Sequence, residues 1–181
     1  AVNNGNWTFN NTGNIALPES MMDKPAVVIA FKYVSTTENS STWEIKNVVV
    51  SGEKGATVEP EEPETPSNDY LNETFATDLG SFTTQETVGS YPWVFAANYG
   101  AKASGYADGA SQNAESWLIS PAMDLTGETK ASIAFDYVIN KGDVNAAATN
   151  HKLLITSNYT GDVTTTEWTE VEYGAVNNGN W

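Results

Sequence analysis

Two short segments of this chain alternate apolar and polar side chains and differ at a single position, IAFKYV at 29–34 and IAFDYV at 133–138. Alternation of this kind places every second side chain on the same face of a β-strand. Their large apolar residues are therefore expected to face a core: Ile29, Phe31, Tyr33, Ile133, Phe135 and Tyr137. We interpret the two segments as central strands that meet the same packing demand, rather than as an internal duplication.

Most of the remaining pattern also predicts β-structure. Further strands are expected at 42–50, 115–119, 151–156 and 167–173, separated by Gly, Asn, Ser and Pro clusters. Pro121 ends one of them, and only 17–23 favours a turn of helix. Many short strands separated at regular intervals by turn-forming residues predict an all-β fold, a jelly-roll β-sandwich of two antiparallel sheets.

The heptad AVNNGNW occurs twice, at 1–7 and at 175–181, with an offset of 174 residues. Seven identities ending in Trp indicate one period of a tandem repeat followed by a short overlap. A designed or duplicated junction is the alternative.

Residues 56–68 carry Pro60, Pro63 and Pro66 among four glutamates and have no apolar face. Such a sequence favours an extended spacer. We therefore predict the C-terminal half of a jelly-roll repeat at 1–55, a linker at 56–69 and the N-terminal half of the next repeat at 70–181. Each half lacks strands that the other supplies, so the order is permuted relative to the parent repeat.

The charge of the chain is strongly acidic, with 23 acidic and 8 basic residues and a formal net charge of −15. No basic stripe is present to neutralise phosphates, which argues against a nucleic-acid partner. Cysteine is absent, which excludes disulfides and Cys-ligated zinc. No apolar stretch is long enough to predict a membrane span, and any export signal is expected upstream of this sequence.

Several strings in a fixed order resemble a known family, above all WLISPAMDL at 117–125 and TWEIKNVVVSG at 42–52. The opening LNETFATDLGSFTT at 71–84 also fits. Read with 70–181 before 1–52, the chain is similar to the choice-of-anchor J and cleaved-adhesin type of domain in Bacteroidetes surface proteins. The resemblance implies a secreted or cell-surface jelly roll with a role in adhesion.

The same resemblance implies a structural calcium ion near the first and last strands. Carried over to this sequence, its ligands would be Glu73, Asn47 and Asp78. Lys46 departs from the family pattern, since relatives often place Asp beside the equivalent of Asn47.

Exposed aromatic side chains are the best candidates for a binding site. Tyr91, Trp93, Tyr99 and Tyr106 lie in a loop-rich stretch at 89–113. Aromatic faces with nearby amides and carboxylates suit the apolar faces of sugars. The alternative is that Trp93 and Tyr99 fill the ends of the sandwich.

Catalysis has little support, because His151 is the single histidine and no cysteine is present. Three hypotheses follow: a non-catalytic structural or adhesive repeat, a carbohydrate-binding module, and a hydrolase that would need measurable turnover. We favour the first, with neighbouring repeats, identical chains, glycans or host surface proteins as partners. The halves could close into one permuted monomer or exchange head-to-tail into a filament.

Overall fold

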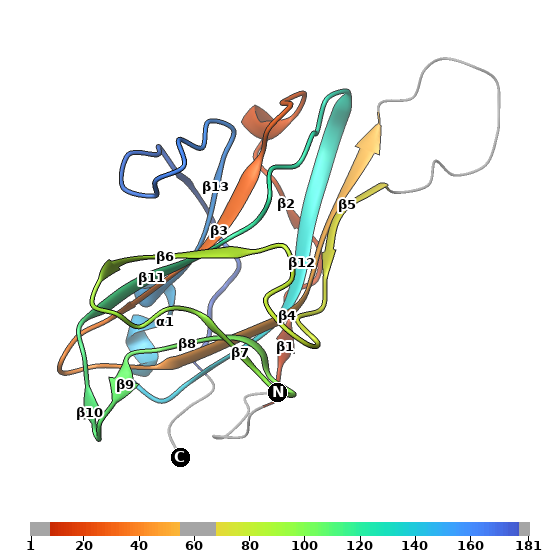
Figure 1. Ribbon diagram of the computed structural model, residues 1–181. Helices are drawn as coiled ribbons and strands as arrows, with labels where there is room; N and C mark the ends of the chain where they lie inside the picture. Colours follow the sequence, from red (N-terminus) through yellow and green to blue (C-terminus); the bar gives the residue numbers. More distant parts are fainter. Residues whose placement is uncertain (1–7, 55–67, 178–181) are drawn as a thin grey trace, which may run out of the picture.

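The computed structural model describes residues 8–54 and 68–177. They form an all-β sandwich of two main antiparallel sheets, as the sequence predicts (Figure 1). The strands are β1 (Asn10–Asn11), β2 (Ile15–Ala16), β3 (Val28–Ser35), β4 (Thr42–Lys54), β5 (Asn68–Glu73), β6 (Thr83–Val88), β7 (Val94–Ala96), β8 (Gly100–Ser104), β9 (Tyr106–Ala107), β10 (Ala110–Ser111), β11 (Ala114–Ile119), β12 (Glu128–Asn140), β13 (His151–Thr156) and β14 (Thr169–Val171). The helical segments are one turn each: η1 (Glu19–Met21), η2 (Val144–Ala146) and α1 (Ala147–Asn150).

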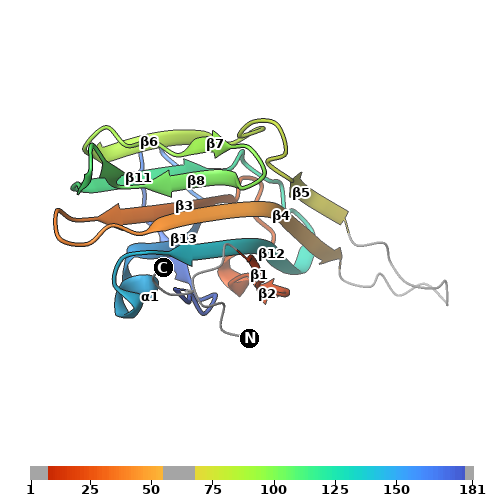
Figure 2. The same ribbon diagram turned by 90° about the horizontal axis from the view of Figure 1, so that it is seen from below.

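Within the described ranges, one sheet has seven strands and follows the order β1-β12-β4-β8-β7, with β2 beside β12 and β5 beside β4. The other has five strands in the order β14-β13-β3-β11-β6. Figure 2 shows the strands of both sheets running in roughly the same direction, as in an aligned sandwich. The chain crosses between the sheets from β3 to β4, from β11 to β12 and from β12 to β13, which is the alternation of a jelly roll.

The two similar hexamers face each other across the sandwich. Phe31 on β3 and Phe135 on β12 are fully buried, and their ring centroids are 5.1 Å apart in an edge-to-face arrangement. The alternating residues around them are core residues as well, which confirms the predicted inward faces. Edge-to-face pairs contribute about 1 kcal/mol beyond the area that they bury.

A β-bulge in β4 explains why its core-facing residues change from odd to even positions along the strand. Trp43 and Ile45 point into the core, but the next inward residue is Val48, three positions later. Across from β12, Lys46 pairs with Asp136 and Val49 with Ala134, so β4 carries one extra residue. Asn47, with φ of 53°, provides that residue, since asparagine adopts positive φ more readily than most side chains.

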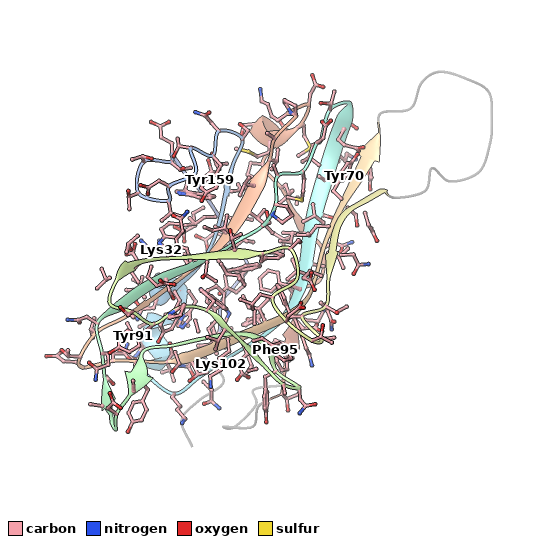
Figure 3. The ribbon with its side chains drawn as sticks, viewed as in Figure 1. Lys32, Tyr70, Tyr91, Phe95, Lys102 and Tyr159 are labelled. Carbon is pink, nitrogen blue, oxygen red and sulfur yellow. The ribbon has the colours of Figure 1, made fainter. Side chains whose placement is uncertain are left out.

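A second, smaller apolar cluster lies on the outer face of the five-stranded sheet. The loop after β13 carries Tyr159 (Figure 3) and Trp168. These two side chains pack against Trp117, so this tryptophan is buried outside the main core. Lys32 lies with its Nζ 4.9 Å from the Trp117 ring centroid and 2.9 Å from a Glu115 carboxylate oxygen. The ammonium and the loop together shield an aromatic surface that the sheet alone would leave open.

The linker boundary predicted at 56–69 needs one correction. Asn68 and Asp69 belong to β5 and pair with Gly52 and Ser51 of β4. The backbone ladder between β4 and β5 therefore begins two residues before the predicted end of the linker. The rest of the predicted linker, 56–67, lies outside the described residues, as does the heptad at 1–7.

Candidate functional site

The four aromatic residues predicted as a sugar site do not form one site. Trp93 is a core residue, only 2% exposed, and its ring centroid is 5.1 Å from that of Trp43. Its indole N–H lies 3.4 Å from the carbonyl oxygen of Ser116. With its ring inside the sandwich, Trp93 cannot offer a face to a ligand.

The three tyrosines are dispersed over the molecule. Tyr91 is half-buried and packs against the core (Figure 3). Tyr99 and Tyr106 are exposed, by 39% and 56%, and they lie just before and just after β8. A strand advances about 3.3 Å per residue, so they are roughly 20 Å apart. Of the four aromatic residues, Tyr106 is the most exposed.

Tyr106 lies at the rim of a groove of about 520 Å³ that three loops build at one end of the sandwich. The loops are the β3–β4 turn, the β9–β10 hairpin and the segment that follows β12. The lining residues are Glu38, Asn39, Ser40, Tyr106, Ser111, Lys141, Gly142 and Asp143. We call this the loop groove.

Local sequence signals explain the shape of the first two loops. β9 and β10 form a hairpin whose connecting residues, Asp108 and Gly109, both have positive φ, the conformation of a tight hairpin turn. In the β3–β4 turn, the Thr36 amide donates to the Asn39 carbonyl, and the Thr36 hydroxyl accepts from the Asn39 amide. A 2.8 Å contact between the Ser40 and Ser111 hydroxyls joins the two loops.

The third wall of the groove, the segment after β12, is held in place where its backbone at Gly142 comes close to the Asn39 side chain. Gly142 has φ of 66°, and a Cβ at this position would lie 2.7 Å from the Asn39 side-chain oxygen. That oxygen accepts the Asp143 amide at 2.7 Å. The Asp143 carboxylate in turn caps η2 by accepting the Asn145 amide at 2.8 Å. Hydrogen bonds thus join the β3–β4 turn to each of the other two walls of the groove.

The chemistry of the loop groove suits a polyhydroxylated ligand. An exposed tyrosine ring provides a flat apolar surface, and Glu38, Asn39 and Lys141 provide a carboxylate, an amide and an ammonium within the same lining. Sugars present alternating apolar faces and hydroxyl groups, so they require such a mixture.

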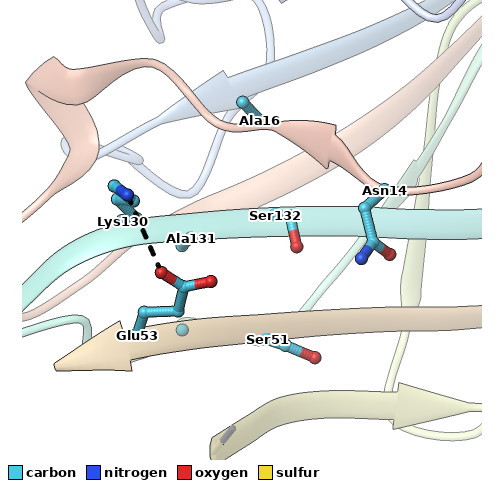
Figure 4. Close-up of a pocket in the computed structure, with 8 residues that line it drawn as sticks. Asn14, Ala16, Ser51, Glu53, Lys130, Ala131 and Ser132 are labelled. Atoms are coloured by element: carbon cyan, nitrogen blue, oxygen red, sulfur yellow. Dashed lines mark ion pairs between the residues drawn. The ribbon is translucent and has the colours of Figure 1, made fainter.

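A second groove, of about 330 Å³, lies on the outer face of the seven-stranded sheet between β2, β12 and β4 (Figure 4). Small residues form its floor, including Ala16, Ser51 and Ser132. Lys130 and Glu53 face each other at 4.0 Å, and both side chains are largely exposed. No aromatic ring is among its lining residues, so it lacks a platform for stacking.

Each residue expected to bind calcium takes part in a hydrogen bond within the fold. The Asn47 amide nitrogen donates to Asp136 at 2.7 Å, while one Glu73 oxygen accepts the Phe75 amide and one Asp78 oxygen accepts the Gly80 amide. Among the residues that the structure describes, no group of three or more His, Cys, Asp or Glu side chains is arranged to hold a metal. Calcium takes six to eight oxygen ligands, so these three side chains alone would not complete a site, and the calcium site stays a prediction.

His151 contacts a serine that sequence reasoning did not single out. Its Nε2 lies 2.6 Å from the Ser41 hydroxyl, and its Nδ1 lies 2.8 Å from the Ala147 carbonyl oxygen. Burial lowers the pKa of His151 to about 4, although the hydrogen bond to Ala147 raises it. Ser41 and His151 are 5% and 2% exposed, and the third partner is a backbone carbonyl rather than a carboxylate. The pair is thus built as a neutral core contact.

Glu44 on β4 is a buried acid on the outer side of the seven-stranded sheet. Burial raises its pKa to about 7, while Lys102 and Lys46 act in the opposite direction. One of its carboxylate oxygens is buried without a hydrogen-bond partner. A protonated carboxyl is the form that such an environment favours.

Sequence reasoning identified Tyr106 but missed the rest of the loop groove. Asp108-Gly109 was a readable hairpin signal, and it would have placed Tyr106 at a loop tip. Nothing in the local sequence indicates that Asn39 and Gly142 meet, since this contact joins loops about a hundred positions apart.

A comparison of the chain with models of known families, with curated proteins and with solved structures finds no match. The resemblance to the choice-of-anchor J type therefore stays a hypothesis that rests on the strings quoted above. In the part of the chain that the structure describes, no helix has the length and apolar character needed to cross a bilayer.

Proposed function

We propose that this protein is a non-catalytic β-sandwich module of an exported, cell-surface protein, and that it contributes to adhesion by binding glycans in the loop groove. One observation carries the proposal: Tyr106, 56% exposed, lies at the rim of a groove whose other walls carry amide, hydroxyl, carboxylate and ammonium groups.

The fixed geometry of the groove supports this function. The hydrogen bond that the Asp143 backbone amide donates to the Asn39 side chain, and the one between the Ser40 and Ser111 hydroxyls, tie the three loops together before any ligand arrives. A preorganised site loses less conformational entropy on binding, which matters for a weak ligand such as a single sugar residue.

The non-catalytic part of the proposal rests on the state of the reactive groups. The Ser41–His151 contact is buried away from the groove surface, and Asp143 is engaged in capping η2. The strong acidity is compatible with an exported setting, where a net charge of −15 favours solubility.

Glycan-array binding and affinity gel electrophoresis test the proposal. The protein should be retained by a glycan, and Tyr106→Ala should weaken retention roughly tenfold, the loss expected for one stacking contact. Tyr99→Ala is the matched control, because Tyr99 is an exposed tyrosine at the other end of β8. No retention by any glycan, or equal retention of both variants, would contradict a glycan site at Tyr106.

A further inference from the structure

We infer that the loop groove binds uncharged glycans and excludes acidic ones, such as sialylated, sulfated or uronic-acid glycans. The inference rests on the proposed glycan function and names its ligand class. Three features support it: the charges of the groove lining, the hydrogen-bonding groups that the lining leaves open, and the absence of arginine from the chain.

The ionisable groups of the groove lining are acidic on balance. Glu38 and Asp143 line the groove together with Lys141, so two carboxylates stand against one ammonium. An anionic glycan bound among them meets more repulsion than attraction, because like charges at contact distance repel even in water. An uncharged glycan meets neither effect.

The carboxylate of Glu38 is open to a ligand. Its backbone amide donates to the Thr36 hydroxyl at 3.3 Å, which fixes the residue in the β3–β4 turn. The Glu38 side chain is exposed and, within the described part of the chain, takes part in no hydrogen bond or ion pair. An ionised carboxylate only accepts hydrogen bonds, so it suits a sugar ring, whose neighbouring hydroxyls donate to both of its oxygens. A carboxylate or sulfate on the ligand has no proton to donate.

Asp143 and Asn39 each use one side-chain atom for the fold and leave another for a ligand. Oδ1 of Asp143 accepts the backbone and side-chain amides of Asn145 at 2.8 and 3.1 Å, and among the described residues Oδ2 has no hydrogen bond. Oδ1 of Asn39 accepts the Asp143 amide at 2.7 Å, which leaves the Asn39 side-chain NH₂ to donate. Two carboxylate acceptors and a neutral amide donor match the hydroxyl groups of an uncharged sugar.

The chain lacks the residue best suited to recognise an acidic sugar. Arginine binds a carboxylate through two parallel hydrogen bonds, and none of the 181 residues is an arginine. Lys141 provides the ammonium of the described lining, and it shares this lining with Glu38 and Asp143. The groove therefore has no dedicated pocket for an anion.

The charge of the whole chain acts in the same direction. With 23 acidic and 8 basic residues, the formal net charge is −15. The resulting field opposes the approach of a polyanion and extends over roughly 8 Å at physiological ionic strength. Salt should therefore weaken the exclusion of acidic glycans and leave the binding of uncharged glycans almost unchanged.

Matched pairs of glycans test the inference on the full-length protein. Lactose and sialyllactose, N-acetyllactosamine and its sulfated form, and galactan and polygalacturonic acid differ chiefly in charge. Any other glycan that retains the protein on an array would be compared with its own acidic derivative. At low salt the uncharged member should bind at least roughly fivefold more tightly, the factor that one like-charge contact provides in water. Salt at about 0.5 M should reduce this factor.

Glu38→Gln and Glu19→Gln separate the charge of the groove from the charge of the whole chain. Each variant removes one negative charge from an exposed side chain. Glu19 lies in η1, which precedes the start of β3, whereas the groove lies beyond the end of β3. Glu38→Gln should weaken binding of the uncharged glycan and strengthen binding of the acidic one, and Glu19→Gln should keep the preference of the parent. Circular dichroism verifies that both variants fold.

The outcomes distinguish this inference from the proposed function. Equal binding of both members of each pair, or tighter binding of the acidic member, would overturn the inference and leave a glycan site in place. An equal loss of preference in Glu38→Gln and Glu19→Gln would also overturn it, because the overall charge would then account for the selectivity. Binding to no glycan at all would overturn the inference together with the proposed function.

Discussion

The hydroxyl of Ser41 lies 2.6 Å from Nε2 of His151, with Nδ1 of the same ring against the Ala147 carbonyl. The imidazole is therefore accommodated in its neutral form, with the Nδ1 proton directed at Ala147 and Nε2 accepting from Ser41. Because the ring is buried among Tyr33 and Trp43, protonation in the folded state is opposed.

This arrangement predicts that acid weakens the fold. His151 has a pKa of about 4 in the folded protein and 6.5 as its ordinary value, so the unfolded chain binds the proton first. The neutral His151 ring therefore contributes about 3 kcal/mol to the free energy of unfolding. This contribution is fully present above pH 6.5 and is lost as the pH falls toward 4. Urea unfolding at pH 7, 5.5 and 4.5 measures it, and His151→Gln should remove the slope. An unchanged slope in that variant would assign acid sensitivity to other groups.

For Glu44 we expect stability to depend on pH in the opposite direction, falling as the pH rises. Its pKa is raised from 4.5 to about 7, so the folded protein holds a proton that the unfolded chain releases. The stability that the protonated Glu44 carboxyl contributes is fully present below pH 4.5 and is lost as the pH rises through 7. Glu44→Gln should therefore be more stable than the parent at pH 8, by roughly 1 to 2 kcal/mol after allowance for solvent screening, and equal to it at pH 4. Thermal unfolding at both pH values tests this. Equal melting temperatures at pH 8 would mean that the carboxylate is accommodated when charged.

Two glycines of the loop groove region provide a matched pair. Gly142 and Gly109 both have positive φ, 66° and 80°, but only Gly142 is crowded, since a Cβ added at Gly109 would meet no atom within 4 Å. Gly109→Ala should cost about 1 kcal/mol of unfolding free energy from backbone strain. Gly142→Ala should cost more, and it should also weaken glycan retention because Asn39 is displaced. Urea unfolding of both variants measures the two costs, and equal values would indicate that the β3–β4 turn yields easily.

Trp93 and Tyr106 should separate stability from binding. Trp93→Ala removes a buried ring and should destabilise the protein by about 3 to 5 kcal/mol. Tyr106→Ala should change the free energy of unfolding by less than about 0.5 kcal/mol, as for most exposed positions. Chemical denaturation of both variants gives the comparison. A large loss of stability in Tyr106→Ala would make its effect on binding uninterpretable as a stacking contact.

A rearranged chain tests the predicted order of the halves. Residues 68–181 followed directly by 8–54 contain one heptad and no connecting segment, and the described ends near Asn177 and Asn10 lie along the same side of β12. We expect this permutant to fold with the circular dichroism spectrum of the parent. An unfolded permutant would show that the connection between 54 and 68 is essential, and the tandem-repeat interpretation would lose its main support.

The inward faces of the central strands could be predicted because alternation alone determines them. The spacing of Trp43, Ile45 and Val48 also indicates the β-bulge. Inward residues of a regular strand are two positions apart, so the step of three from Ile45 to Val48 requires one extra residue. Asp136 stands between Phe135 and Tyr137 in the alternation, and it lies outside the core with Asn11 and Asn47 donating to its two carboxylate oxygens.

The location of isolated aromatics could not be predicted in the same way. Trp93 lies in the core and Tyr106 at a loop tip, although both belong to the same loop-rich stretch at 89–113. Trp117 is buried outside the main core, under the loop that carries Trp168, with the two ring centroids 5.6 Å apart. Which loop covers which face depends on contacts distant in sequence, and local periodicity carries no information about them.

The position of β3 has a consequence for how the chain is synthesised. Its stretch Val28–Phe31 is buried on both faces, and its two partners, β11 and β13, are encoded far downstream. During translation this strand therefore leaves the ribosome long before either neighbour, as an apolar segment with free backbone donors and acceptors. Such segments associate readily with one another and fold slowly because their contacts are distant. The charges of nearby Lys32 and Glu38 oppose such association while the strand is unpaired.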